Sequence, residues 1–183
     1  YLYDLAIFHR QLASRFTGVP MFLLGHSMGG LITSNYLLRH QGDFVGAILS
    51  APAIKTDRQP GRVQKLLLRL LALLTPRLGI LKLNAGGVSR NPEVVRNYIE
   101  DPLVFHGKMS ARMLRELFAG MSAIQASAER ITLPMLLLHG GADVMTAPDG
   151  SRFLYEHISS TDKTLKIYPD LYHEILNEPE RAE

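Results

Sequence analysis

The stretch Gly25-His26-Ser27-Met28-Gly29-Gly30 decides the fold because of what stands on either side of it. It directly follows the apolar run 19–24, which is too short for a helix, and it precedes a helical pattern that begins at Leu31. A strand that ends in G-x-S-x-G and turns at once into a helix is a nucleophile elbow, in which a strained turn exposes the serine hydroxyl above the sheet. Ser27 is therefore the candidate nucleophile.

The glycines of this stretch have an expected steric purpose. Gly25 and Gly29 lie two positions on either side of Ser27. We expect strand and helix to pass so closely at both positions that no room is left for a Cβ atom. An ordinary strand-to-helix turn is the alternative, and the strand and helix patterns around the stretch favour the catalytic interpretation.

Outward from the elbow, the sequence predicts a mostly parallel α/β sheet flanked by helices. The patterns indicate a helix over 1–16, a strand over 19–24, a helix over 29–40 and a strand over 44–49. Strand, helix and strand in that order require a parallel sheet with a right-handed crossover. The continuous apolar runs are typical of parallel strands that are covered on both faces.

The sheet pattern disappears after 54 and returns at 131. Helical patterns over 63–74, 92–98 and 111–118 fill the gap, and no strand is expected there. Strand character returns over 134–139 and 164–168, with a helix over 148–158 between them. We therefore expect one domain over 1–183, composed of a core part with the elbow over 1–54, a helical cap insertion over 55–130 and a core part over 131–183.

A serine hydroxyl needs a base to take its proton, and the base needs an acid that holds its tautomer. Where this elbow occurs, the partners follow in the order serine, acid, histidine, each in a loop after the end of a strand. Gly140-Gly141-Ala142-Asp143 follows the strand over 134–139, and His173 follows the last strand. We expect Asp143 as the acid and His173 as the general base.

Other titratable side chains are weaker candidates. Asp149 remains the alternative acid, although it lies at the expected start of a helix, where aspartate more commonly serves as the N-cap. His26 is expected to point away from Ser27, and His139 to cap the strand before the acid loop. Surface or packing positions are expected for His9, His40, His106 and His157. No histidine spacing supports a metal site, and no metal or other cofactor is expected.

Attack by a serine places negative charge on the substrate carbonyl oxygen, which backbone N–H groups must stabilise. The residue after the nucleophile, Met28, supplies one donor, and a loop after an early strand supplies the other. The sequence before Ser27 contains no such strand and loop. We expect a fragment, in which the sheet begins at the strand before Ser27 and exposes an edge.

Composition is that of a globular protein, with 46% hydrophobic and 20% charged residues. The absence of cysteine excludes disulfides and thiolate metal sites. The leucine-rich stretch of the insertion is about twelve residues long, whereas a membrane span needs about twenty. Between Lys55 and Lys82, seven cations accompany the single acid Asp57, although the net charge of the chain is only +3. The first part of the insertion is therefore strongly basic.

Leucines rather than aromatic residues alternate with these cations, which disfavours nucleic acid as a partner and favours a lipid surface. We expect the leucines of 66–74 to form a lid that faces a bilayer and an acyl chain, with packing against the core as the alternative. The expected localisation is cytoplasmic or peripheral on a membrane. Candidates for lining an acyl pocket are Met109, Met113, Met121 and Met145.

The chain resembles the monoacylglycerol lipase and lysophospholipase branch of the α/β-hydrolases, which have a serine aminopeptidase-like domain. The resemblance rests on the elbow and on Leu49-Ser50-Ala51-Pro52, Asp101-Pro102-Leu103, Leu138-His139-Gly140-Gly141-Ala142-Asp143 and Tyr172-His173-Glu174. It implies an α/β-hydrolase fold in which Ser27, Asp143 and His173 are nucleophile, acid and base, and in which the cap forms an acyl tunnel. Family members also have early strands with an oxyanion loop and a helix after the histidine, and we expect both to be absent here.

The expected function is the hydrolysis of a lipid ester, of monoacylglycerol or lysophospholipid type, through an acyl-enzyme intermediate. A carboxylesterase, peptidase or haloperoxidase acting on small substrates is one alternative. A non-catalytic binding protein of the same fold is another, and the intact set of Ser27, Asp143 and His173 disfavours it. Serine at position 27 also argues against the aspartate nucleophile of epoxide hydrolases and dehalogenases.

Overall fold

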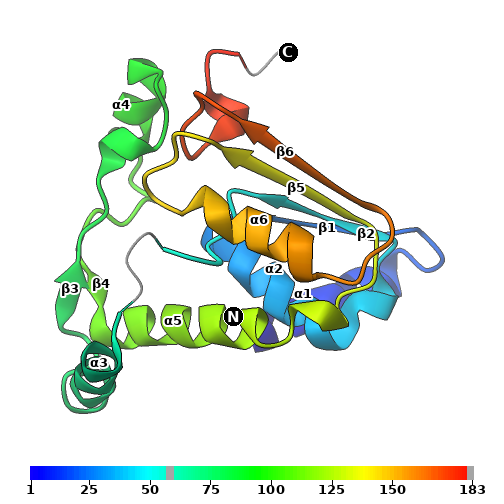
Figure 1. Ribbon diagram of the computed structural model, residues 1–183, viewed down its shortest axis with the longest axis horizontal. Coiled ribbons are helices and arrows are strands. Elements are labelled where there is room, and N and C mark those ends of the chain that lie inside the picture. Colours follow the sequence, from blue (N-terminus) through cyan, green and yellow to red (C-terminus); the bar gives the residue numbers. More distant parts are fainter. Residues whose placement is uncertain (57–59, 181–183) are drawn as a thin grey trace.

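The computed structural model describes residues 1–56 and 60–180. Its main sheet runs in the order β1 (Phe22–His26), β2 (Gly46–Ser50), β5 (Met135–Gly140) and β6 (Lys163–Tyr168), as Figure 1 shows. All three strand pairs are parallel, as expected from the alternation of strands and helices. Parallel strands have their carboxyl ends at the same edge of the sheet, so the loops that follow them gather there.

Helices α2 (Met28–His40) and α6 (Pro148–His157) pack against the same face of this sheet (Figure 1). Every second residue of a strand points to that face. Leu49 of β2 and Leu137 of β5 are fully buried there, together with Leu37 of α2 and Leu154 of α6. Helix α1 (Leu2–Arg15) lies beside α2 and has no fully buried residue. The predicted helices over 1–16, 29–40 and 148–158 are confirmed.

The opposite side of β1 is open to solvent. Phe22 and Leu24 are 66% and 58% exposed, although the apolar run 19–24 predicted a strand covered on both faces. That expectation is wrong because, among the described residues, nothing covers the face of β1 to which Phe22 and Leu24 point. The expectation that the sheet begins at the strand before Ser27 is confirmed.

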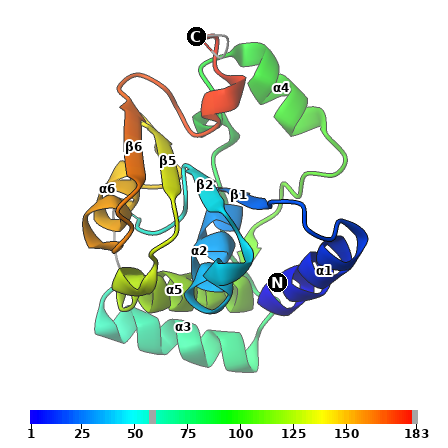
Figure 2. The ribbon, with the colours of Figure 1, turned by 90° about the vertical axis from the view of Figure 1, so that its right-hand side faces the viewer.

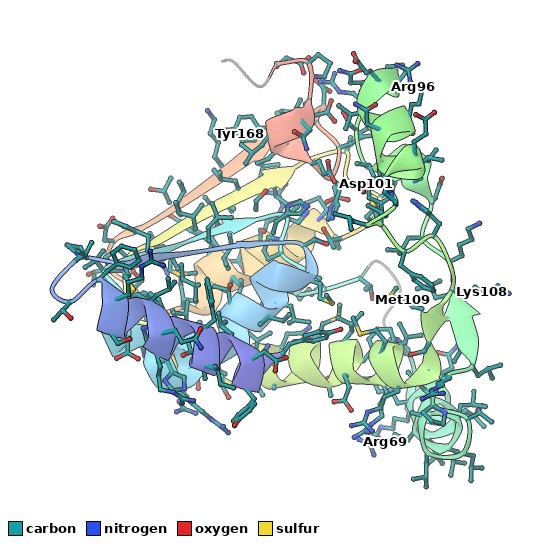
Figure 3. The ribbon with its side chains drawn as sticks, turned by 180° about the vertical axis from the view of Figure 1, so that it is seen from behind. Arg69, Arg96, Asp101, Lys108, Met109 and Tyr168 are labelled. Atoms are coloured by element: carbon teal, nitrogen blue, oxygen red, sulfur yellow. The ribbon has the colours of Figure 1, made fainter. Side chains whose placement is uncertain are left out.

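The segment between β2 and β5 forms α3 (Arg62–Leu74), α4 (Pro92–Glu100) and α5 (Ala111–Gln125), as the helical patterns predicted. The expectation of no strand in this segment is wrong. Strands β3 (Gly79–Leu81) and β4 (Met109–Ser110) pair antiparallel beside α3, and Figure 3 shows Met109 and Lys108 at this small sheet. A ladder of two or three residues leaves no periodic pattern in a sequence. The chain also forms short 3₁₀ helices η1 (Gln41–Asp43), η2 (Ala85–Gly87), η3 (Ala128–Arg130) and η4 (Ile175–Asn177).

The last helix of the insertion belongs to the main core. Met121 and Ile124 of α5 are buried in the same apolar cluster as Leu31 of α2. Helix α3 packs on the far side of α5, away from the sheet (Figure 2). The division of the chain into core parts over 1–54 and 131–183 and an insertion over 55–130 stays a prediction.

The elbow between β1 and α2 depends on two close backbone approaches. A Cβ on Gly25 would lie 2.5 Å from Thr33 Oγ1 and 2.6 Å from the carbonyl oxygen of Gly29, and a Cβ on Gly30 would lie 2.7 Å from that of Pro52. A Cβ on Gly29 would meet nothing within 4 Å. The steric need that we expected at Gly29 therefore does not exist, because its backbone rather than its Cβ direction faces the strand.

Gly25→Ala should destabilise the protein by about 1–3 kcal/mol, because the added methyl group overlaps backbone that cannot move freely. Gly29→Ala is the matched control. It should be neutral or stabilising by up to about 1 kcal/mol, since alanine has a higher helix propensity than glycine. Urea unfolding followed by circular dichroism measures both changes. Equal free energies of unfolding for the two variants would contradict the close approach.

Candidate active site

Ser27 occupies a strained turn between β1 and α2. Its backbone angles are φ 54° and ψ −120°, in the left-handed region that L-residues rarely adopt. Such a conformation costs on the order of 1–3 kcal/mol and persists only where its surroundings hold it. The Ser27 N–H donates to the Ser50 carbonyl over 3.0 Å, and the Ser27 carbonyl accepts from the Ala53 N–H over 3.0 Å. The end of β2 thus fixes the turn.

Asp143 and His173 meet in the loops after β5 and β6. His173 Nδ1 lies 2.7 Å from Asp143 Oδ2, and both side chains are buried. Because a carboxylate only accepts, Nδ1 carries the proton and Nε2 is left as the basic nitrogen. The two loops touch directly at Gly140, where a Cβ would overlap the carbonyl oxygens of Leu171 and Tyr172. The sequence prediction that these two side chains come together agrees with this geometry.

The Asp143 carboxylate receives several donors. Oδ1 accepts from the backbone N–H groups of Met145 at 2.7 Å and Thr146 at 3.0 Å, and Oδ2 also accepts from the Thr146 hydroxyl at 2.8 Å. Burial alone would raise the pKa of Asp143. Hydrogen bonds from His139 and His173 outweigh it and hold the pKa well below the usual aspartate range. The Asp143 carboxylate is therefore charged at neutral pH.

His139 is the residue near the site that sequence reasoning misjudged. We expected it to cap the strand, but its ring is fully buried, and Nε2 lies 3.2 Å from Asp143 Oδ2. Nε2 also faces the Thr146 carbonyl oxygen at 3.3 Å, so it carries the proton, and Nδ1 accepts from the Ser151 hydroxyl at 2.8 Å. The strand alternation, which places His139 on the face of buried Leu137, was the signal for an inward position.

His26 lies against the proposed base. We expected its side chain to point away from Ser27, and this stays a prediction. The ring centroid of His26 lies 4.7 Å from that of His173, and its Nδ1 is 3.2 Å from Ser50 Oγ. Burial, followed by the nearby His173, lowers the pKa of His26 below its ordinary value. A neutral His26 places no additional positive charge beside His173.

The alternative acid, Asp149, lies on the exposed surface of α6. Its side chain is 80% exposed and pairs with Arg152 at 3.5 Å. The N-cap role that we expected for Asp149 is wrong, because Ala147 is the N-cap of α6 and Pro148 is its first residue. The geometry thus favours Asp143 as the acid.

Met28 is the first residue of α2, where an N–H has no partner within the helix. It also lines an open cavity of about 810 Å³ between α1, α2 and α5. Within residues 1–56 and 60–180 the Ser27 hydroxyl makes no hydrogen bond, and no second oxyanion donor is identified. Contacts between nucleophile and base often tighten only when substrate binds. The roles of Ser27, Asp143, His173 and Met28 stay predictions.

The candidate acyl-pocket methionines do not gather in one place. Met113 lines the cavity beside Met28, whereas Met109 lines a separate cavity of about 570 Å³ in the insertion. Met121 is buried in the main core. Across the described part of the chain, no group of three or more acidic or histidine side chains is arranged to hold a metal ion.

Comparisons with known proteins place these features in context. The family of serine aminopeptidases S33 matches residues 1–180. The chain is 39% identical to the monoacylglycerol lipase of Mycolicibacterium smegmatis, over 89% of this chain and 58% of that protein. It is 36% identical to the monoglyceride lipase of Rattus norvegicus, over 85% of this chain and 52% of that protein.

A solved structure shows the same architecture. The monoacylglycerol lipase of Paleococcus ferrophilus superposes with a TM-score of 0.86 at 35% identity, over 98% of this chain and 68% of that chain. The α/β-hydrolase fold class that the sequence indicated is confirmed. The chain spans little more than half the length of the two relatives it matches.

Asp143→Asn should lower the turnover of an activated ester on the order of 10⁴-fold, because an amide cannot hold the Nδ1–H tautomer of His173. Asp149→Asn is the matched control and should leave turnover unchanged. Steady-state kinetics on p-nitrophenyl butyrate with equal amounts of folded protein measure both. A normal rate for Asp143→Asn, or a large loss for Asp149→Asn, would reverse the assignment.

Proposed function

The chain belongs to the serine aminopeptidase S33 family of α/β-hydrolases, and from that premise we propose that it hydrolyses carboxylic esters of monoacylglycerol or lysophospholipid type. The observation that carries the proposal is the buried hydrogen bond of 2.7 Å between His173 and Asp143, at the same sheet edge as the strained turn of Ser27. The resemblance of the chain to monoacylglycerol and monoglyceride lipases at 36–39% identity supports an acylglycerol substrate.

The proposed reaction proceeds by two acyl transfers. The Ser27 hydroxyl attacks the ester carbonyl carbon while His173 Nε2 takes its proton, and Asp143 stabilises the imidazolium that forms. The Met28 N–H donates to the developing oxyanion. His173 then returns the proton to the leaving alcohol, and the acyl group remains on Ser27. A water molecule, deprotonated by His173, releases the fatty acid and regenerates the serine.

The cavity of about 810 Å³ beside Met28 is the proposed site for the acyl chain. Its lining combines Leu31 and Ile32 of α2 with Met113 and Leu117 of α5, so most of its surface is apolar. Apolar walls with few polar groups are typical of a site that binds an alkyl chain. Because Met28 follows Ser27 directly, a chain bound here has its ester end near the nucleophile.

Ser27→Ala should abolish both ester hydrolysis and covalent labelling by a fluorophosphonate, since no other group on this turn can form the acyl-enzyme. The unmodified protein should cleave monoacylglycerols of medium or long chain faster than short esters. Labelling gels and a panel of acyl lengths measure the two results. Labelling that persists in Ser27→Ala would overturn the nucleophile.

The same panel separates the alternatives. Preference for short esters, peptides or halide oxidation would indicate a small-substrate hydrolase or haloperoxidase. No labelling of the unmodified protein under any condition would indicate a non-catalytic member of the fold. The first outcome differs from the proposed function in the substrate that is cleaved, and the second in that Ser27 does not react.

We further propose that α3 contacts a membrane surface without crossing it. No helix in the described part of the chain is long and apolar enough to span a bilayer. Only Ala72 of α3 is buried, and the half-buried Lys65 and Leu68 complete the stripe that faces α5. The remaining apolar side chains of α3 are exposed: Val63, Leu66, Leu67, Leu70, Leu71, Leu73 and Leu74.

The charge of α3 supports the same proposal. The helix contains Arg62, Lys65 and Arg69 and no acidic residue, and Figure 3 shows Arg69 on α3 at the corner of the molecule. Basic residues beside exposed leucines suit the anionic surface of a membrane leaflet. Lys55, by contrast, lies over the Phe153 ring at 4.4 Å. Asp57 and Arg58 of the basic segment lie outside the described residues.

A double substitution of Leu73 and Leu74 to serine should weaken binding to vesicles of anionic lipid roughly tenfold, because these side chains lose the apolar contribution of insertion. They are 76% and 75% exposed, so folding should be unaffected. Phe8→Ser, on the exposed side of α1, is the control and should bind normally. Vesicle sedimentation measures the binding, and equal binding by all three proteins would contradict the proposal.

A further inference from the structure

The segment after His173 contains a fully buried carboxylate. Glu178 has 0% of its surface exposed, and Oε1 accepts from the Tyr172 backbone N–H at 2.8 Å. The same carboxylate accepts from Arg90 twice, from its backbone N–H at 3.2 Å and from its side-chain Nε at 3.0 Å. A buried charge needs such partners because it has lost its hydration. Glu178 therefore joins the residue before His173 to a residue of the insertion.

Further hydrogen bonds run along the same contact. The Glu174 N–H donates to the Val88 carbonyl at 2.8 Å, and the Ser89 hydroxyl donates to the Asn177 carbonyl at 3.2 Å. Val88 and Ser89 are both buried. The His173 N–H itself faces the Gly87 carbonyl at 3.5 Å. Residues 87–90 of the insertion are thus bonded directly to the segment that contains His173.

We propose that Glu178 is a positioning residue, which fixes His173 relative to Ser27 by tying Tyr172 to Arg90 of the insertion. The inference rests on the proposed function, because it assumes that His173 acts as the base. It adds a residue with no place in the triad or the oxyanion hole. Glu178 then holds the general base in a fixed position relative to the insertion.

The chemistry of the base explains why this tie matters. His173 must bring Nε2 within reach of the Ser27 hydroxyl while Nδ1 keeps its 2.7 Å bond to Asp143. The Tyr172 N–H belongs to the peptide unit one residue before the ring, so movement there displaces both nitrogens together. A misplacement of about 1 Å at a reacting group can cost roughly 10²-fold in rate.

The chain provides a matched control in Glu180. Its carboxylate pairs with Nη2 of the same Arg90 but is 41% exposed and has no bond to the histidine loop. The hydrogen bond that Arg90 donates to Glu180 raises the pKa of Arg90 and lowers the pKa of Glu180. Exposed ion pairs of this kind contribute little to stability. A substitution of Glu180 removes a charged partner of Arg90 and leaves the bond between Glu178 and Tyr172 intact.

The test compares Glu178→Gln, Glu178→Ala and Glu180→Gln in the full chain. Glu178→Ala should lower kcat roughly 10²-fold with KM little changed, since the base is displaced and the acyl site is not. Glu178→Gln keeps one oxygen for the Tyr172 N–H and should recover part of that loss. Glu180→Gln should match the unmodified protein. Rates are normalised to the folded fraction from circular dichroism, and Glu178→Gln, which preserves the shape of the side chain, decides the matter if Glu178→Ala does not fold.

Normal kcat in folded Glu178→Gln and Glu178→Ala would show that the hydrogen bonds of Glu178 serve folding alone, and it would overturn the proposal. An equal loss in Glu180→Gln would overturn it as well. A second readout needs no turnover: the Nδ1 proton resonance of His173 should shift or broaden in Glu178→Gln and stay in place in Glu180→Gln. If the unmodified protein hydrolyses no ester, the proposed function fails, while this resonance still tests the tie between Glu178 and the histidine loop.

Discussion

The close approach of β1 to α2 at Gly25 is the constraint on which the rest of the site depends. A Cβ there would overlap the Gly29 carbonyl, so only glycine lets β1 and α2 pass this closely. The chain reverses direction at Ser27, which adopts φ 54°. The cost of this conformation is met by the backbone bonds between Ser27 and the end of β2. The same turn makes Met28 the first residue of α2, with its N–H free. The candidate nucleophile and the proposed oxyanion donor thus result from the same backbone turn.

The proposed partners of Ser27 meet at a second close approach, between the loops after β5 and β6. Gly140 allows the histidine loop to lie directly on the acid loop, so a buried carboxylate and a buried imidazole can meet at 2.7 Å. Burying a charge is unfavourable unless every lone pair is used. Thr146, Met145 and His139 supply the other donors to Asp143. The network is therefore a condition for a charged acid at this depth.

The residues whose place follows from topology were predictable from the sequence. Parallel strands bring their carboxyl ends together, so Asp143 and His173 could be assigned to one edge before any contact was known. Contacts that depend on the direction of a side chain were missed, such as His139 on Asp143 and His26 beside His173. The short pair of β3 and β4 left no pattern. Gly29 was misjudged because spacing in a motif does not say which glycine has a crowded Cβ.

The insertion is anchored to the core at two places, and this determines which of its parts can act independently. Helix α5 contributes Met121 and Ile124 to the main apolar cluster, and residues 87–90 bind the histidine loop. Helix α3 stands outside both anchors, since it packs on α5 through the narrow stripe that contains Ala72. Its exposed leucines therefore add little to the stability of the fold. A surface that the fold does not need for its own core is free to contact lipid, as we propose for α3, while the anchored part of the insertion holds the loop of the proposed base His173.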